Sequence, residues 1–305
     1  MCLWSKLHRR RRARREAEEK ARRDAEERAY LVAEEKLRLA AEEQARREAE
    51  EKTRREAEEK ARREAEVRAR REATEKVRLA AEEQDRLDPE IQRIRQKTGI
   101  EMVLIPSGEF FYGEDKQRVH LPAYCLARTP VTNAQYKTFV DATGHPAPFH
   151  WRDGGIPYRK EDHPVVRVSW EDAQTFCKWA GCRLPTEQEW EKAARGTDGL
   201  EYPWGNWWEP GRCNSSEAGW KDTTPVGLYD RYPSGASPYG LLDMAGNVWE
   251  WCEDWLYDGI RRCNALRGGS WGNNSGVVRA AYRAWGYTTV GSSDGGFRCA
   301  APAEP

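Results

Sequence analysis

Residues 239–251 read YGLLDMAGNVWEW, and this stretch places two tryptophans directly after a loop of small and polar residues. The same pattern continues on both sides, where tryptophans from Trp204 to Trp285 alternate with Gly, Asn and Pro. A buried aromatic ring removes about 150–250 Å² from water, so a few rings can build a core without long strands or helices. Residues 100–305 are therefore predicted to fold as a loop-rich α+β domain.

Regular elements are expected mainly at the start of this domain. Residues 102–106 and 108–110 have the apolar character of two short strands separated by a turn. Three helices are predicted because a Ser or Thr stands at each N-cap, with an apolar stripe behind it. These helices cover residues 134–143, 170–181 and 187–195.

The first hundred residues have a different composition. Residues 13–84 repeat in blocks of eight, such as ARREAEEK and LRLAAEEQ, without Gly or Pro. Ala, Glu, Arg and Lys favour helix, and acid–base pairs four residues apart recur, as in Glu48 and Lys52. The predicted organisation is a basic lead at 1–12, a charged helix at 13–88, a linker at 89–99 and the globular domain at 100–305.

The eight-residue repeat leaves open whether this helix is solitary or paired. At about 100° per residue, eight residues advance about 80° beyond two turns, so no face stays in place from block to block. The larger apolar residues are too sparse for a continuous heptad seam. A solitary rod held by ion pairs is slightly favoured over an Ala-rich oligomeric coil, in which residues 13–84 would self-associate or bind a partner helix.

Charge and cysteine content narrow the function classes. The chain has 51 Lys and Arg against 51 Asp and Glu, so no nucleic-acid partner is expected. The eight Cys include no CxxC pair and no Cys/His cluster at zinc spacing. They are interpreted as mostly reduced thiols, with a Cys177–Cys182 disulfide as a lesser alternative.

No signal peptide or membrane-spanning run is visible, which predicts a cytoplasmic protein. An acylated Cys2 beside the basic residues 8–12 would be a less favoured membrane anchor.

Five segments of the domain resemble signature blocks of the formylglycine-generating enzyme (sulfatase-modifying factor) family, in family order. The resemblance covers about residues 100–301. It implies a C-type-lectin-like fold, with loops around a small antiparallel sheet and two or three flanking helices. The segments are TPVTNAQY at 129–136, HPV at 163–165 with VSW at 168–170, RLPTEQEWE at 183–191, PWGN at 203–206 and YGLLDMAGNVWEW at 239–251.

The resemblance also locates the family's reactive centre. Two catalytic cysteines follow the Gly-Gly-Ser of the last block, which here reads LRGGSW at 266–271 and closes with GFRCA at 296–300. The matching positions hold Asn273 and Val278, and neither side chain supplies a thiolate. The chain is therefore predicted to bind no copper and to be a non-enzymatic member. An active oxidase would need copper on cysteines outside this motif.

Other catalytic motifs are missing from the sequence. It contains no Walker A loop, no GxSxG and no HExxH, and its five His are scattered. Three acidic residues of the predicted third helix, Glu187, Glu189 and Glu191, are interpreted as a capping box and a solvated helix face rather than an acid/base pair.

The resemblance further implies structural calcium beside the GNVWEW block and at an upstream Asn. Carried over, the ligands would be Asn214, Asn247 and Glu250, because side-chain and carbonyl oxygens in loops suit Ca²⁺. Asn247 could instead shape a turn without any ion.

Residues 272–295, GNNSGVVRAAYRAWGYTTVGSSDG, contain no Lys, Glu, Gln, Leu, Ile or Met. Every residue except Trp285 can be encoded by AAC with its first two adenines replaced. This pattern is expected of a variable region written by a diversity-generating retroelement. Variable proteins of such retroelements resemble this chain in their lectin-like fold, in a variable segment near the C-terminus, here 271–298, and in kinship with the formylglycine-generating family.

The C-terminal segment is accordingly predicted to bind a protein or another macromolecule of unknown identity. The alternative is a catalytically inactive or divergent member of the family that acts in bacterial signalling or assembly. The predicted ligand-binding residues are Gly272, Asn273, Asn274, Gly276, Val277, Ala284, Gly286, Tyr287, Val290, Ser292, Ser293 and Asp294. The side chains expected to lie inside as a fixed frame are Trp271, Arg279, Arg283, Trp285 and Phe297.

Overall fold

The chain divides into two compact units, Met1–Arg68 and Ala69–Pro305. The predicted basic lead, with Cys2, lies outside the described residues. In the part of the chain that is described, no helix is long and apolar enough to cross a membrane. The computed structural model describes residues 20, 22–23, 34–36, 38–39, 42–44, 46–61, 63–64, 67–68, 89–231, 234–257, 262–289 and 291–303.

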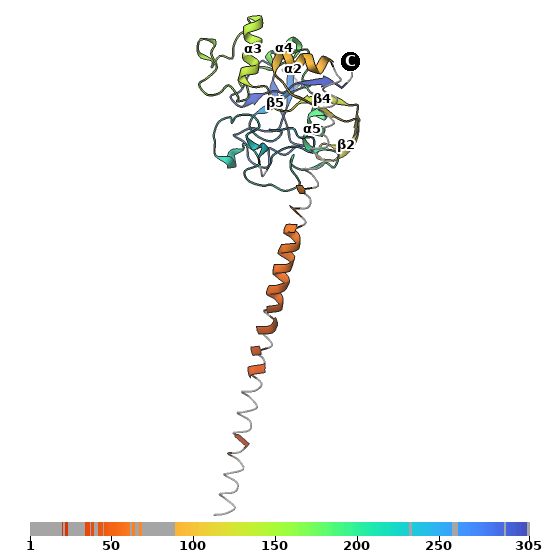
Figure 1. The fold of residues 1–305 in the computed structure, drawn as a ribbon, viewed down its shortest axis with the longest axis vertical. Helices are drawn as coiled ribbons and strands as arrows, with labels where there is room; N and C mark the ends of the chain where they lie inside the picture. The colour runs from red at the N-terminus through yellow and green to blue at the C-terminus, as the bar shows by residue number, and fades with distance from the viewer. Residues whose placement is uncertain are drawn as a thin grey trace, which may run out of the picture. The chain divides into compact units, whose positions relative to one another are not determined.

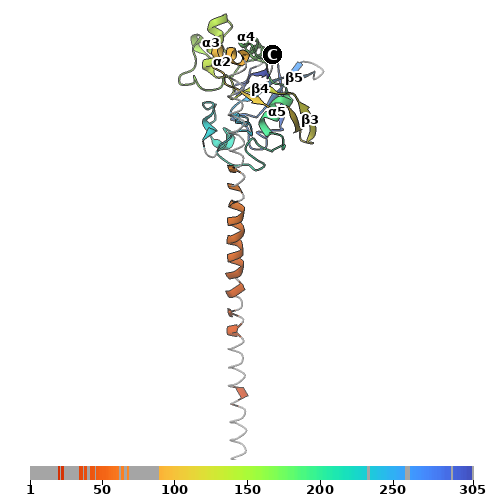
Figure 2. The ribbon, with the colours of Figure 1, turned by 45° about the vertical axis from the view of Figure 1, so that its right-hand side comes forward.

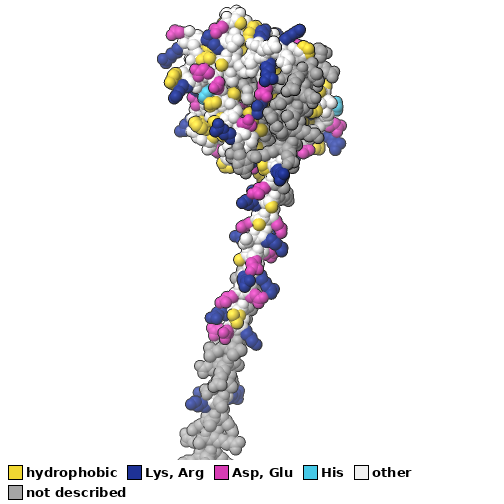
Figure 3. All heavy atoms as spheres, viewed as in Figure 1, with side chains coloured by type: hydrophobic (Ala, Val, Ile, Leu, Met, Phe, Trp, Pro, Cys, Tyr) yellow, Lys and Arg dark blue, Asp and Glu magenta, His cyan; other side chains and the backbone are white. Residues whose placement is uncertain are grey.

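The described part of the octad repeat is helical. Residues 46–61 form a continuous α-helix with every residue exposed. Side chains four residues apart form ion pairs along it, including Arg47 with Glu43 at 2.6 Å and Arg63 with Glu59 at 2.7 Å. Figure 3 shows Lys, Arg and Glu side chains along the described part of this helix. Because exposed pairs each contribute at most about 1 kcal/mol, the helix draws mainly on the propensity of its residues. Whether it is solitary or paired stays a prediction.

The second unit, the head, holds the remaining elements. Helices α2, α3 and α4 gather at one end of the head, near the C-terminus of the chain (Figures 1 and 2). The helices are α2 (Pro89–Thr98), α3 (Asn133–Thr143), α4 (Trp170–Ala180) and α5 (Glu187–Arg195), with short 3₁₀ turns η1 (Arg152–Gly154), η2 (Ser216–Ala218) and η3 (Leu228–Asp230). The strands are β1 (Met102–Ile105), β2 (Gly108–Tyr112), β3 (Gln117–Leu121), β4 (Tyr124–Ala127), β5 (Trp249–Tyr257), β6 (Arg262–Arg267), β7 (Arg283–Tyr287), β8 (Gly295–Gly296) and β9 (Ala300–Pro302).

The strands form small sheets, as the lectin-like prediction requires. One sheet has the order β1-β4-β9, β2 and β3 form a hairpin, and a four-stranded sheet has the order β7-β6-β5-β8. Pairing is antiparallel except between β5 and β8. The strand β7, which carries part of the predicted variable region, is therefore an edge strand with one neighbour.

The three predicted helices are confirmed, and so is the reason for their positions. Thr132, Ser169 and Thr186 each accept a hydrogen bond from the backbone N–H three residues on, and each helix has a complete capping box. Such caps satisfy backbone donors that have no partner inside the helix. Gly144 and Gly181 end α3 and α4 in the left-handed conformation that favours glycine.

Residues 89–99 are not a linker, contrary to the sequence prediction. They form α2, and Ile91 and Ile94 lie in the same core cluster as residues of α3 and α4. The spacing of these two isoleucines places them on one face of the helix, which is why the face can be buried. Residues 89–98 therefore belong to the head.

Aromatic rings form the centre of each core cluster, but of the nine tryptophans between Trp204 and Trp285 only Trp204 and Trp251 are buried, so the prediction that this run builds the core is largely wrong. Tyr136 stacks on Phe176 with ring centroids 5.6 Å apart, and Phe297 contacts both rings edge-on. A second cluster surrounds the buried Trp190, and a smaller third one contains Tyr202 stacked on Trp204. Phe297 is fully buried, so its predicted place in the frame is confirmed.

Candidate ligand-binding site on the C-terminal segment

The segment from Trp271 to Asp294 is joined to the head by main-chain hydrogen bonds spaced along its length. Trp271 N donates to Asn247 O at 3.1 Å, and Ser216 N donates to Asn273 O at 2.9 Å. Further along, Trp170 N donates to Thr288 O at 3.0 Å. Because peptide groups make these contacts, they do not depend on which side chains the segment carries.

Strand β7 separates outward from inward positions. Arg283, Trp285 and Tyr287 are exposed, whereas Ala284 and Gly286 alternate with them on the inner side. A Cβ atom at Gly286 would lie 2.6 Å from the Trp251 ring, too close for any side chain. Gly286 therefore has no room for a side chain that varies, and ligand binding by Ala284 and Gly286 stays a prediction.

The same alternation corrects the predicted frame. Arg283 and Trp285 lie outward, so the prediction that they are held inside is wrong; Trp285 is 37% exposed and Tyr287 is 44% exposed. The Arg283 guanidinium is nevertheless held, because Nε donates to Glu187 Oε1 at 3.0 Å. Trp271 and Arg279 are half-buried.

Two predicted binding residues instead stabilise the turn that starts the segment. The Ser270 hydroxyl lies 2.8 Å from both Asn273 Oδ1 and Asp294 Oδ2, and Ser270 N donates to Asn273 Oδ1 at 2.9 Å. Both side chains are half-buried. Asn273 and Asp294, near the two ends of the segment, are thus both bound to Ser270. This contradicts the prediction that their side chains are free on the surface.

The remaining predicted positions are largely accessible. Val277 is half-buried, and Val290 lies outside the described residues. The exposed positions of the predicted set, called here the display residues, are Gly272, Asn274, Gly276, Tyr287, Ser292 and Ser293.

The two positions that match the family's catalytic cysteines lack reactive groups. The amide of Asn273 is engaged by Ser270, and Val278 is fully buried among Tyr202, Trp204 and Cys213. Cys213 is the thiol in that cluster, and burial raises its pKa to about 12. It is therefore protonated near neutral pH, and no residue of this cluster can replace the missing thiolate.

A cleft of ≈ 540 Å³ is lined in part by the middle of the segment, between Arg279 and Arg283. The β2–β3 hairpin forms one side through Tyr112, Glu114 and Asp115, and the segment forms the other through Arg279 and Arg283. Arg279 donates to Glu114 Oε2 and to Glu201 Oε1, both at 3.0 Å, so an ion pair crosses the cleft. The walls are charged on both sides, which suits a polar ligand.

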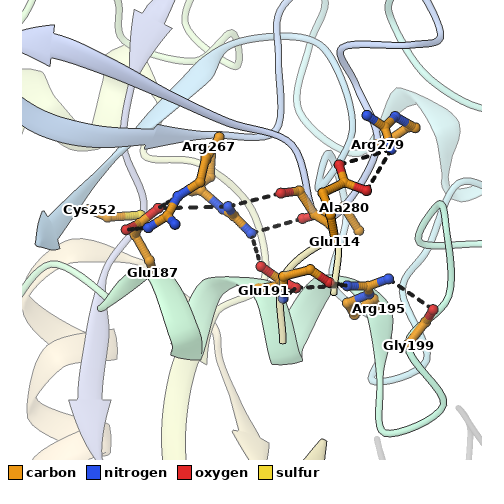
Figure 4. A network of polar contacts seen from close by, with 12 residues as sticks. Glu114, Glu187, Glu191, Arg195, Gly199, Cys252, Arg267, Arg279 and Ala280 are labelled. Atoms are coloured by element: carbon orange, nitrogen blue, oxygen red, sulfur yellow. Dashed lines mark hydrogen bonds and ion pairs between the residues drawn. The ribbon is translucent and has the colours of Figure 1, made fainter. Parts of the chain in front are cut away.

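A buried ionic network lies beneath this cleft (Figure 4). Arg267 of β6 forms a charge-assisted hydrogen bond with Glu191 of α5 and donates to the carbonyls of Ala280 at 3.0 Å and Ala281 at 3.3 Å. Glu191 also accepts from Arg195 Nη1 at 2.8 Å and from Gly113 N at 2.6 Å. One carboxylate and one guanidinium thus join α5, β6, the hairpin and the segment.

This network corrects the interpretation of the α5 acids. Glu189 belongs to a capping box, as predicted, but Glu187 and Glu191 are buried rather than solvated, with exposures of 2% and 0%. Both face arginines from distant parts of the chain, Arg267 and Arg283. Glu187 and Glu191 are spaced to share a helix face with Trp190, which could have indicated their burial. Their arginine partners come from distant parts of the chain and could not be predicted from local sequence.

The predicted calcium ligands do not share one environment. Both Glu250 oxygens are taken: Arg298 donates to them at 2.6 and 2.7 Å, and Trp190 Nε1 donates to Oε2 at 2.7 Å. Glu250 is therefore not available to a cation, and its assignment as a calcium ligand is wrong. Asn247 Oδ1 accepts from Thr224 N at 3.0 Å, as a turn-shaping residue does.

Asn214 is different, because its buried side-chain oxygen has no hydrogen-bond partner. An oxygen in this state suits a hard cation, which takes six to eight such ligands. A calcium ion at Asn214 and Asn247 stays a prediction.

Comparison with known proteins agrees with this architecture. Residues 88–303 match the family described as the sulfatase-modifying factor enzyme 1-like domain. The chain belongs to this family. It is 34% identical over 285 residues to the formylglycine-generating enzyme of Streptomyces coelicolor, which covers 66% of this chain and 89% of that protein. It is 41% identical over 170 residues to the inactive C-alpha-formylglycine-generating enzyme 2 of Bos taurus, covering 50% of this chain and 56% of that protein.

This chain spans only part of another similar protein. The chain is 37% identical over 242 residues to the serine/threonine-protein kinase pkn1 of Chlamydia pneumoniae, covering 66% of this chain but only 38% of that protein. Among solved structures, Treponema denticola variable protein 1 has a TM-score of 0.56 and 23% identity, covering 66% of this chain and 94% of that one. The head of this family member has the C-type-lectin-like fold predicted from its sequence.

The ion pair between Glu250 and Arg298 can be tested by removing the charge of Glu250. Glu250→Gln leaves the Arg298 guanidinium buried without its carboxylate, and breaking a buried pair costs about 3–5 kcal/mol. We expect a large drop in the free energy of unfolding, measured by urea denaturation, that is the same with calcium or with a chelator. A difference in unfolding free energy between wild type and Glu250→Gln that is smaller with a chelator than with calcium would mean that Glu250 is a calcium ligand.

Proposed function

We propose that the head is a non-enzymatic ligand-binding domain that displays a diversified site on its C-terminal segment. The observation that carries the proposal is that the segment combines a main chain bound to the head with side chains exposed to solvent. Its main chain is fixed by Arg267 and by hydrogen bonds to surrounding loops, while the side chains of the display residues are exposed. Apart from Trp285, every residue from 272 to 295 is one that a codon derived from AAC can encode.

The physical advantage of this arrangement is preorganisation. A side chain on a backbone that is already fixed loses little further entropy when it binds, so affinity depends on the contacts that it makes. Tyr287 is a large and rigid aromatic group, and Asn274, Ser292 and Ser293 offer adaptable hydrogen bonding. Rigid aromatics with small polar neighbours are the residue types that dominate evolved binding surfaces. The ligand is a protein or another macromolecule, its identity set by this particular set of side chains.

The proposal of a non-enzymatic role rests on Asn273 and Val278. The likeness to an inactive member of the family, the bovine protein, supports a loss of catalysis on this scaffold. A second candidate, a divergent family member acting in bacterial signalling, is favoured by the match to the chlamydial kinase pkn1. The two candidate functions make different predictions: only the display function requires the segment to vary between copies of the gene.

The display premise can be tested by changing both faces of the segment with residues that AAC-derived codons encode. The variant Asn274→Tyr, Tyr287→Ser, Ser292→Tyr and Ser293→Asn alters only exposed positions, where a change usually shifts stability by about ±0.5 kcal/mol or less. Its matched control, Ala284→Tyr with Gly286→Ser, alters the inward positions of β7. Overpacking against Trp251 should cost about 1–3 kcal/mol or more.

Urea denaturation followed by tryptophan fluorescence measures both. We expect the outward variant to unfold near the wild-type midpoint and the inward variant well below it. Equal destabilisation by the two would mean that the segment is ordinary core, and the display proposal would be wrong.

The non-enzymatic assignment has its own assay. The full chain, loaded with copper under oxygen, should leave the cysteine of a sulfatase-type Cys-x-Pro-x-Arg peptide unoxidised, because no thiolate stands at positions 273 and 278. The Streptomyces coelicolor enzyme, run in parallel, shows that the assay works. Formylglycine above the level of a no-protein blank, detected by mass spectrometry, would overturn the assignment.

A further inference from the structure

Three cysteine thiols meet at the end of α4, away from the C-terminal segment's display residues. Cys177 lies in the last turn of α4, Cys182 follows its C-cap Gly181, and Cys299 precedes β9. Their Sγ atoms all lie within 4.8 Å of one another, and those of Cys177 and Cys299 are 3.7 Å apart. Within the described residues, no other three His, Cys, Asp or Glu side chains converge in this way.

Main-chain hydrogen bonds hold the three positions in place. Cys182 N donates to Cys177 O at 2.8 Å across the left-handed Gly181. The neighbouring residues Arg183 and Ala300 exchange two hydrogen bonds of 2.9 and 2.7 Å, which brings the chain after α4 beside the chain that contains Cys299. The thiols are therefore placed together by the fold and not by a bond among themselves.

The spacing of the sulfur atoms fits a metal ion. All three cysteines are free thiols in the structure. With Zn–S bonds of about 2.3 Å, two sulfurs of a tetrahedral site lie about 3.8 Å apart. The observed 3.7 Å between Cys177 and Cys299 matches this value.

The prediction that no cysteines have zinc spacing is wrong for one pair. Cys177 and Cys182 are separated by four residues, which lies within the C-x₂₋₄-C spacing of zinc sites. Cys299 is more than a hundred residues further on, so the third ligand could only come from the fold.

The surroundings favour a cation held by thiolates. The cluster lies at the C-terminal end of α4, where the helix dipole attracts positive charge. Lys97, which donates to Trp179 O, and Arg183 lie beside the cluster and can offset the net negative charge of three thiolates around a divalent ion. Cys177 and Cys299 are fully buried, while Cys182 is half-buried and gives access from solvent.

We propose that Cys177, Cys182 and Cys299 form a three-thiolate site for a thiophilic divalent ion, namely Zn²⁺, with water as the fourth ligand on the Cys182 side. Binding releases the three thiol protons, so a protein with three thiols and one Zn²⁺ yields a zinc–thiolate centre and three H⁺. The ion would join the end of α4 to the chain just after Phe297 and Arg298. It would thereby fix the C-terminal end of the segment that carries the display residues.

Metal content and spectroscopy test this site on the full chain. Protein purified under reducing conditions without chelators should contain one zinc per chain, and cobalt substitution should give thiolate-to-cobalt charge-transfer and tetrahedral d–d bands. Cys182→Ser should lose the zinc and the charge-transfer band. Cys213→Ser, which changes a buried thiol in another cluster, is the matched control and should keep both.

Several results would overturn the site. These are wild-type protein that takes up neither zinc nor cobalt, equal loss of metal in Cys213→Ser, or a non-reduced mass two hydrogens lighter because two of the thiols form a disulfide instead. If Cys182→Ser does not fold, the cobalt spectrum of the wild-type chain decides: tetrahedral thiolate bands support the site, and their absence contradicts it.

Discussion

The buried contact between Arg267 and Glu191 is the constraint on which the C-terminal segment depends. A guanidinium cannot lose its charge in the interior, so it must find a carboxylate and further acceptors there. Arg267 is 0% exposed and takes its acceptors from Glu191 and from the carbonyls of Ala280 and Ala281. The path of the segment is thus fixed through its peptide groups, and its outward side chains can change without altering that path.

A second buried pair anchors the other end of the same region. Arg298 makes a bidentate contact with Glu250 and also donates to the carbonyls of Ala127 at 2.9 Å and Leu242 at 2.9 Å. Arg267 and Arg298 flank the segment in sequence, and each pairs with buried carboxylate oxygens and donates to several carbonyls. Removing Glu250 leaves an uncompensated buried charge on Arg298. This explains how a domain with short strands and many loops can hold a surface strand such as β7 in one position.

Local sequence was sufficient for features that depend on neighbouring residues. The helices α3, α4 and α5 follow from their capping residues, whereas the density of tryptophan did not show which rings are buried. Features that depend on distant partners were missed. Burial of Glu191 requires Arg267 from another strand, and the inward position of Gly286 requires knowing that β7 pairs with β6 and lies against Trp251. The linker prediction failed at α2 because its apolar face finds partners only on α3 and α4.

The central claim is that the display residues vary while the frame around them does not. The most direct measurement is sequencing of the gene and its surroundings in many descendants of one cell of the source strain. The account predicts a near-copy of the 3′ coding sequence that differs at adenines, beside a reverse transcriptase gene. It also predicts substitutions concentrated in the codons for 272–294 and scarce in those for 183–195. An isolated gene, with substitutions equally frequent in both stretches, would contradict it.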